Sequence, residues 1–371
     1  MNKKNKIIFL THWFPNKENP FFGIFIKNHA DALSLKNDVT IVNFDIKQSK
    51  KVVKTSLIKS DNKNYTIRIE SLFYKLLYYF IPLHYILFKI LIKKYDINIK
   101  NFDFLFSNII FPNGIIAGKI AEKYKIKHIH IEHWSKLNKF FKKDIYRKKG
   151  RITLAKCNNI ICVSESLKKE LSKQISKKIS IIPNIINQNI FKQKINEYKS
   201  ENIIFVAVAN WQYPKNPFYF LEALNEVKKT HNNIELKIIG SGPILNDVKQ
   251  NKYSYKISYM GVLDSKTIAE ELNTSNFLLH GSDYETFSVI IIESLSTGTP
   301  VLVSNIGIAS EVINDHNGFI CGNTVNDWVK KINMAISKNY PPSIVSKSTK
   351  NIFSINTVAL KFNEILAEKQ P

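Results

Sequence analysis

The sequence predicts an α/β protein made of two Rossmann-like domains that face each other across a cleft. Strand-like and helix-like segments alternate along all 371 residues, which is typical of parallel sheets covered by helices on both faces. The length suits two domains, each with its own core. The composition, 44% hydrophobic, is that of a globular protein. Ligands of such sheets bind at the carboxyl ends of the strands, so we expect the two domains to enclose a cleft.

Short apolar runs bounded by polar or glycine-rich segments indicate the strands. In the first half they lie near Lys6–Leu10, Asp38–Phe44, Tyr65–Ser71, Asp103–Asn108, Lys127–His133, Asn159–Ser164 and Ile179–Pro183. In the second half they lie near Ile203–Ala209, Ile234–Gly240, Ile257–Gly261, Asn276–His280, Pro300–Ser304 and Gly318–Cys321. Helical patterns lie between most of them.

A polar, lysine-rich stretch near Asn187–Ser200 separates the two sets of strands. We therefore predict an N-terminal domain over residues 1–190 and a C-terminal domain over residues 191–350. Residues 351–371 follow a polar loop and contain a last predicted helix, near Ile355–Lys369. No internal repeat interrupts this plan.

The positive charge of the chain is confined to its first half. The net charge is +24, yet residues 1–200 hold 39 Lys and Arg against 14 Asp and Glu, whereas residues 201–371 hold 15 against 16. A compositional bias of the whole chain would raise the lysine content of both halves. The asymmetry therefore indicates that the first half faces an anionic partner.

The cysteines and the chain start point to a reducing compartment. Cys157, Cys162 and Cys321 lack metal-type spacing and are expected to be buried thiols. Only four apolar residues, Ile7–Leu10, follow the first lysines, which is too short for a signal peptide. We expect a cytoplasmic protein whose chain begins with a β-strand.

Two glutamates, Glu285 and Glu293, bracket a predicted strand-loop-helix element within Gly281–Ser304. Glu285 lies in the loop, and Glu293 lies inside the helix predicted over Phe287–Thr297. The free N–H groups at a helix start suit a phosphate, and carboxylates accept hydrogen bonds from sugar hydroxyls. One element can thus hold both ends of a nucleotide sugar. A βαβ unit with two unrelated glutamates gives the same pattern.

This pattern resembles the E-x7-E signature of the retaining GT-B glycosyltransferases of family 4, the group 1 glycosyl transferases. The resemblance implies that Glu285 contacts the donor sugar and Glu293 the ribose. It also implies that the backbone at Phe287, Ser288 and Val289 holds the diphosphate. In GT-B enzymes the final helix returns to the first domain, so residues 351–371 are expected to do so.

Two loops of the second half extend the resemblance. In VAVANWQYPKNP, Lys215 matches the family lysine that binds the pyrophosphate, but Asn210 stands where the family has Arg. Asparagine lacks the bidentate, charged contact that Arg provides, so diphosphate binding would rest on Lys215 and helix amides. In IIGSGP, Gly242 matches a family turn near the nucleotide base. That turn is equally consistent with a purely structural role.

Two residues of the first half are also candidates. His133 ends a predicted strand where the family has a histidine close to the donor sugar and phosphate, and His128 and His130 are weaker candidates. Without a function, His133 would simply end the strand. Gly23 precedes a helix and matches the second glycine of a family Gly-Gly pair, whose first position is Phe22 here. Glycine there permits a close approach of ligand to backbone.

No D-x-D motif with the strand context of metal-dependent glycosyltransferases is present, and the D-x-E at Asp283 to Glu285 lies within the E-x7-E element. We therefore expect neither a metal nor another cofactor. The apolar stretch Ser71–Tyr95 is broken by lysines and Pro82, and only thirteen residues separate Lys75 from Lys89. A membrane span needs about 20. The stretch is either a core helix or an interfacial helix.

The leading hypothesis is a retaining, metal-independent glycosyltransferase at the cytoplasmic face of a membrane. It would transfer a sugar from a nucleotide sugar to a glycan, lipid-linked, in capsule, exopolysaccharide or lipopolysaccharide synthesis, with His133, Glu285 and Lys215 at the reacting centre. The N-terminal domain would bind the acceptor and an anionic membrane surface. The alternatives are a nucleotide-sugar 2-epimerase of the same fold and a non-catalytic sugar- or nucleic-acid-binding protein. No nucleic-acid-binding module is recognisable, so we expect no nucleic-acid partner.

Overall fold

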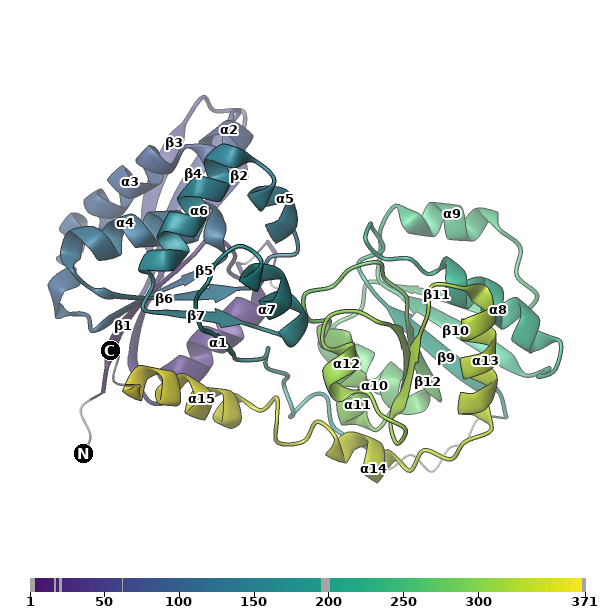
Figure 1. Ribbon diagram of the computed structural model, residues 1–371. Helices are drawn as coiled ribbons and strands as arrows, with labels where there is room; N and C mark the ends of the chain where they lie inside the picture. Colours follow the sequence, from purple (N-terminus) through teal and green to yellow (C-terminus); the bar gives the residue numbers. More distant parts are fainter. Residues whose placement is uncertain (1–3, 17, 20–21, 62, 195–200, 369–371) are drawn as a thin grey trace. The chain divides into compact units, whose positions relative to one another are not determined.

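A computed structural model describes residues 4–16, 18–19, 22–61, 63–194 and 201–368 (Figure 1). The chain forms two compact units. The first combines Met1–Ile185 with Ile355–Pro371, and the second is Ile186–Ser354. Of the predicted features, residues 195–200 of the boundary stretch and Lys369 at the end of the last helix lie outside the described residues.

The described residues of the first unit form one sheet in the order β3-β4-β2-β1-β5-β6-β7-β8. Its strands are β1 (Lys6–Thr11), β2 (Asp38–Gln48), β3 (Lys54–Lys59), β4 (Asn64–Ser71), β5 (Phe104–Asn108), β6 (Lys127–Glu132), β7 (Asn159–Cys162) and β8 (Ile179–Ile181). Each predicted strand of this half is present. The predicted strand ending at His133 stops at Glu132, so His133 is the first residue of the following loop.

Strand β3 was not predicted, and it is antiparallel to β4, so the sheet is not wholly parallel. Its sequence, KTSLIK, has no buried residue. It lies at the edge of the sheet, where one row of backbone N–H and C=O groups has no neighbouring strand to pair with. The apolar run that marks a buried parallel strand is therefore absent.

Helices cover both faces of this sheet (Figure 1). They are α1 (Ile24–Ser34), α2 (Tyr74–Tyr79), α3 (Ile81–Lys94), α4 (Ile115–Tyr124), α5 (Leu137–Phe141), α6 (Asp144–Lys156), α7 (Glu165–Ser172) and α15 (Ile355–Ala367), with short turns η1 (Ile99–Asn101) and η2 (Ile110–Gly114). Helices α1 and α15 pack together over β1, β5 and β6, where Phe9, Ile26 and Phe362 are fully or almost fully buried. The C-terminal helix thus belongs to the core of the first unit.

The apolar stretch Ser71–Tyr95 forms two helices rather than one. Phe80 leaves the helical conformation between α2 and α3, and Pro82 lies in the first turn of α3, where its missing N–H costs no hydrogen bond. Helix α3 buries Leu87, Phe88 and Leu91 in the core, whereas α2 buries none of its residues. The core interpretation therefore holds for one face of α3 and not for α2. None of the helices formed by the described residues is both long and apolar enough to cross a membrane.

The second unit forms a parallel sheet with order β11-β10-β9-β12-β13-β14 among its described residues. Its strands are β9 (Ile203–Val208), β10 (Ile234–Ile239), β11 (Lys256–Gly261), β12 (Phe277–His280), β13 (Val301–Ser304) and β14 (Gly318–Cys321). All were predicted. The strand order reverses between β9 and β12, and a ligand of such a sheet binds at the carboxyl ends of the strands flanking that reversal.

The helices of the second unit also cover both faces of its sheet (Figure 1). They are α8 (Phe218–Lys228), α9 (Ile244–Gln250), α10 (Ser265–Thr274), α11 (Val289–Thr297), α12 (Ala309–Val312), α13 (Val325–Ile336) and α14 (Pro342–Lys347). Helices α8 and α13 pack together around Phe220 and Trp328, and α10 contacts α11. Helix α11 was predicted from Phe287 but begins at Val289, because Ser288 has a left-handed φ of 73°.

Candidate functional site

Two loops at the reversal of the second sheet are joined by hydrogen bonds. One follows β9 and carries Lys215, and the other follows β12 and carries Glu285. The Asn216 N–H donates to the Gly281 carbonyl at 3.0 Å, and the Asp283 N–H donates to the Pro214 carbonyl at 2.9 Å. A Cβ on Gly281 would lie 2.1 Å from the Asn216 carbonyl oxygen. Only glycine therefore permits the two loops to approach this closely.

The joined loops bring Lys215 and Glu285 into a direct ion pair, with both side chains less than one fifth exposed. The carboxylate also lies 3.6 Å from Nε2 of His280, which is 3.0 Å from the Ser288 hydroxyl. Burial lowers the pKa of Lys215 to about 8. Burial, and then the charge of Lys215, hold the pKa of His280 well below its usual range. At neutral pH the imidazole of His280 is therefore uncharged.

The helix start beside this pair is uncapped and firmly held. No side chain caps α11, so its first N–H groups are available to an anion. The buried residue Phe287 anchors the turn, because its carbonyl accepts a hydrogen bond of 2.9 Å from the Ile308 N–H. Ser288 and Val289 follow at the helix start itself. The two joined loops together offer a cation, a carboxylate and free amides.

Glu293 lies on α11, four residues after Val289 and therefore on the same side of the helix as its start. Its carboxyl group is half-buried and has neither a hydrogen-bond nor an ion-pair partner within the described residues. Burial raises its pKa to about 8. A half-buried carboxyl group without a partner is costly for folding alone, and perturbed groups of this kind cluster at functional sites.

The turn after β10 packs directly on the Lys215 loop. Gly242 has a φ of 150°, and a Cβ there would lie 2.2 Å from the Trp211 carbonyl oxygen. The Trp211 N–H donates to the Ser241 carbonyl at 2.8 Å. Asn210, next to Trp211, is exposed. Close packing alone accounts for glycine at position 242, and Asn210 lies on the surface of the same loop.

In the first unit, the structure brings the start of α1 and His133 together. Gly23 has a φ of 68°, and a Cβ there would lie 2.5 Å from the Trp13 carbonyl carbon. The His133 ring lies 5.0 Å from the Phe25 ring, and its Nε2–H donates a hydrogen bond of 3.2 Å to Oδ1 of Asn108. Asn108 ends β5, and the other residues follow β1 and β6, which are its neighbours in the sheet.

Burial holds the pKa of His133 well below its usual range. The neighbouring rings of His29 and His130 lower it further, and an interaction with Asn184 opposes the shift only in part. His133 is 4% exposed. It is therefore a neutral imidazole at physiological pH, able to form hydrogen bonds but not to carry a charge.

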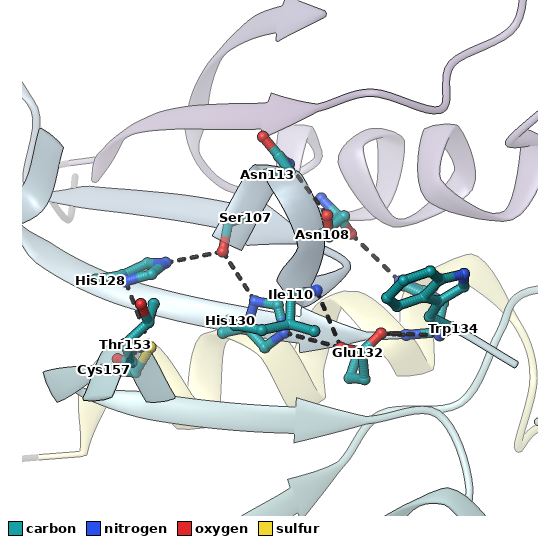
Figure 2. Close-up of polar contacts among 11 residues, drawn as sticks. Ser107, Asn108, Ile110, Asn113, His128, His130, Glu132, Trp134, Thr153 and Cys157 are labelled. Carbon is teal, nitrogen blue, oxygen red and sulfur yellow. Dashed lines mark hydrogen bonds and ion pairs between the residues drawn. The ribbon is translucent and has the colours of Figure 1, made fainter. Parts of the chain in front are cut away.

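Sequence reasoning missed Glu132, which organises the backbone around His133. Figure 2 shows its contacts with Ile110 and Trp134. One oxygen of this fully buried carboxylate accepts hydrogen bonds of 2.8 Å from the N–H groups of His133 and Trp134. The other accepts from the Ile110 N–H at 3.0 Å and lies 3.3 Å from Nε2 of His130. A charged residue at the end of an otherwise apolar and histidine-bearing strand was the available signal.

His128 and His130 point into the interior as parts of a buried chain of hydrogen bonds (Figure 2). The Ser107 hydroxyl joins Nδ1 of His130, at 2.9 Å, to Nε2 of His128, at 2.8 Å. Nδ1 of His128 lies 3.3 Å from the Cys157 sulfur. Both histidines lie on the same face of β6, since residues alternate along a strand.

The second residue that sequence reasoning missed is His280, a histidine at the end of β12.

The described residues contain no group of three His, Cys, Asp or Glu side chains placed to hold a metal ion.

The predicted site residues form two groups. Lys215, Glu285, Phe287, Ser288 and Val289 lie together in the second unit, with Glu293, Asn210 and Gly242 on the same or adjoining segments. Gly23 and His133 lie together in the first.

Two family models match the chain, one after the other. Residues 25–189 match glycosyltransferase family 4, and residues 187–351 match glycosyl transferases group 1. Together the two matches cover most of the chain.

Curated relatives match parts of the chain. It is 29% identical over 225 residues to the Escherichia coli UDP-Gal:alpha-D-GlcNAc-diphosphoundecaprenol alpha-1,3-galactosyltransferase, covering 54% of this chain and 57% of that enzyme. It is 25% identical over 228 residues to a subunit of the Arabidopsis thaliana phosphatidylinositol N-acetylglucosaminyltransferase, covering 59% of this chain and 51% of that protein. The chain thus spans little more than half the length of these two relatives.

Solved structures share the fold over nearly the whole chain. Sucrose-phosphate synthase from Thermosynechococcus elongatus superposes with a TM-score of 0.75 at 16% identity, covering 98% of both chains. HepE from Anabaena, solved with UDP and glucose, superposes with a TM-score of 0.68 at 14% identity, covering 98% of this chain and 99% of that one. The predicted α/β fold with two Rossmann-like domains is thereby confirmed, and the chain belongs to the group 1, family 4 glycosyltransferases of the GT-B fold.

Proposed function

We propose that this glycosyltransferase is a retaining, metal-independent enzyme that transfers a sugar from a nucleotide sugar to a lipid-linked glycan. The observation that carries the proposal is the Lys215–Glu285 ion pair at the uncapped start of α11, with the unpartnered Glu293 on the same helix. A cation, free amides and two carboxyl groups match the diphosphate, the donor sugar and the ribose of such a donor in chemistry and in number.

Each donor contact follows from the chemistry of the side chain. Lys215, which pairs with Glu285 in the loop before α11, binds the diphosphate together with the backbone at Phe287, Ser288 and Val289. Glu285 accepts hydrogen bonds from hydroxyls of the donor sugar, and Glu293 accepts them from the ribose. Asn210 and Gly242 border the diphosphate and the base. The structure of HepE with UDP and glucose is a fold neighbour that binds this class of ligand.

The chemical step needs no enzyme nucleophile. The bond from the anomeric carbon to the diphosphate oxygen breaks, and its electron pair leaves with the diphosphate. The acceptor hydroxyl forms the new bond on the same face of the sugar and passes its proton to the departing phosphate oxygen. Lys215 and the helix amides stabilise the charge that develops on the diphosphate. His133, neutral through burial, contributes a hydrogen bond at the reacting centre.

The acceptor is assigned to the first unit. Its half of the chain carries the positive charge, and relatives named above act on lipid-linked or phosphatidylinositol substrates. A groove of about 690 Å³ lies beside β2 and β4, where Arg68 donates to Asp45 at 2.9 Å and Lys47 to Glu18 at 2.7 Å. Such paired charges suit glycan hydroxyls. We place the enzyme at the cytoplasmic face of a membrane, in cell-surface polysaccharide synthesis.

The test is a panel of UDP-, GDP- and other nucleotide sugars, with EDTA present throughout. Thermal stabilisation and slow release of free sugar are measured for the wild type and for Glu285→Ala. One donor that stabilises the protein and is hydrolysed, with hydrolysis lost in the variant, supports the proposal. Loss of activity in EDTA contradicts metal independence. A donor converted to its C2 epimer without release of sugar identifies an epimerase instead.

A further inference from the structure

Seven large apolar side chains form one exposed surface at the end of the first unit. Each is between 48% and 71% exposed, and this apolar surface comprises Val52, Val53, Leu72, Phe73, Leu76, Tyr79 and Phe80. Helix α2 supplies its centre and lies beyond the ends of β2 and β4 (Figure 1). An exposed apolar patch of this kind marks an interaction site.

The apolar surface is a built feature rather than a loose loop. The Leu72 N–H donates to the Lys51 carbonyl at 2.7 Å, and the Ser71 hydroxyl donates to the Val52 carbonyl. The loop after β2 and the start of α2 are therefore held side by side. Helix α2 buries none of its six residues. Leu77 and Tyr78 are partly buried, and the Tyr78 ring packs against His12 and Phe111. The side of α2 that carries Leu76 and Tyr79 is the exposed one.

The charge around the surface specifies an anionic partner. Lys50, Lys51, Lys54 and Lys75 are all exposed at its edge. Residues 71–95 contain no Asp or Glu. Apolar side chains ringed by lysines fit the interface of a bilayer that carries anionic lipids, where apolar groups enter the acyl region and ammonium groups remain among the headgroups.

A chain of packed aromatic rings connects this surface to His133. The ring of Tyr79 lies 5.3 Å from that of Phe111, which lies 5.6 Å from Phe140, which lies 5.9 Å from Trp134. Trp134 follows His133 directly. The apolar surface and the segment after β6 are thus connected through packed side chains of the first unit.

We propose that the apolar surface docks the enzyme on an anionic bilayer, so that a lipid-linked acceptor keeps its hydrocarbon chain in the membrane while its sugar is glycosylated. The lipid-linked acceptor in this inference rests on the proposed function. Docking of the apolar surface on a bilayer does not depend on it. Apolar contact contributes the depth of insertion, and the lysines contribute a salt-sensitive attraction.

The test is sedimentation of the full-length protein with vesicles. Vesicles of phosphatidylcholine alone are compared with equimolar phosphatidylcholine and phosphatidylglycerol. The double variant Phe73→Ser with Leu76→Ser is expected to bind the anionic vesicles about tenfold more weakly, since two apolar side chains leave the interface. The matched control is Val262→Ser with Met334→Ser, which removes two exposed apolar side chains from the second unit and leaves binding unchanged.

Three outcomes overturn the docking proposal. The wild type does not bind anionic vesicles, the double variant binds them as the wild type does, or the surface instead pairs two copies of the chain. In the third case the wild type forms a concentration-dependent dimer and does not bind vesicles. The double variant does not form that dimer, whereas the control variant does. Thermal stabilisation by the nucleotide sugar found in the donor panel is measured in parallel. If the donor still stabilises the double variant, that variant is folded. If the wild type binds vesicles but responds to no donor, the proposed function is wrong while the docking proposal stands.

Discussion

The Lys215 ammonium group contacts the Glu285 carboxylate across 70 residues of sequence. The contact joins the loop after β9 to the loop after β12, on either side of the point where the strand order reverses. Each charge is the main partner of the other, and each is proposed to bind a different part of the donor. The ion pair therefore holds both loops in place. When the donor binds, each side chain can replace this contact by one to the donor.

Replacing Lys215 by alanine is expected to weaken binding of the nucleoside diphosphate about tenfold to hundredfold, which is the range for one charge-assisted hydrogen bond. Binding of the free nucleoside should change little. Calorimetric titration of both ligands measures the difference. The control is Lys237→Ala, because Lys237 pairs with Glu271 at 2.7 Å and both side chains are 18% exposed. An equal loss for nucleoside and diphosphate would contradict a phosphate-binding role for Lys215.

A methyl group on Gly281 tests whether loop contact matters for the donor. Gly281→Ala places a Cβ against the Asn216 carbonyl, so the loops must separate, and donor affinity should fall about tenfold while overpacking costs about 1–3 kcal/mol. Gly261→Ala is the comparison: its φ is 68°, but its Cβ meets nothing within 4 Å. That variant should lose about 1–2 kcal/mol of stability through backbone strain alone. If both variants keep full donor affinity, the loop contact is not required.

The strands could be predicted because most are buried on both faces and read as short apolar runs. Strand β3 could not, since it has no buried residue and sits at a sheet edge. The start of α11 was misplaced by two residues because the left-handed φ of Ser288 leaves no trace in a sequence. A left-handed conformation at a single non-glycine residue is uncommon, and residue type alone does not signal it.

The site was predictable as a set of residue types in order, but not as a geometry. Lys215, Glu285 and Glu293 were identified from two separate motifs that resemble those of the family. The approach of His280 to Glu285 depends on how two loops meet. The role of Glu132 depends on the Ile110 N–H pointing back at β6 from another segment. A single charged residue in a buried strand indicates that some partner exists, without indicating which.

Glu132 is expected to act as a positioning residue for His133. Glu132→Gln removes a carboxylate that accepts three backbone N–H groups and contacts His130. A displaced His133 loop should lower kcat about tenfold to hundredfold, with donor KM within about twofold because the donor contacts lie elsewhere. Steady-state kinetics separates the two constants. Ser107→Ala, which breaks the histidine chain but spares these N–H bonds, should change kcat little. A matching loss in Ser107→Ala, or a loss confined to KM, would argue against positioning.

The raised pKa of Glu293 predicts a stability that falls as the pH rises. Burial moves this pKa from 4.5 to about 8. Between these values the folded protein holds a proton that the unfolded chain has released, so each rise in pH favours unfolding, and above about pH 8 the full cost remains. Glutamine has no such proton. Glu293→Gln should therefore raise the Tm by a few degrees above pH 8, with a smaller gain near pH 5. Thermal melts across this range, with Glu222→Gln at an exposed position as control, measure the effect.

Glu293→Gln should also bind the nucleoside more weakly if Glu293 holds the ribose, so a gain in stability would accompany a loss of affinity. A pH dependence of the Tm identical to that of the wild type would show that Glu293 is ionised at neutral pH in the folded protein.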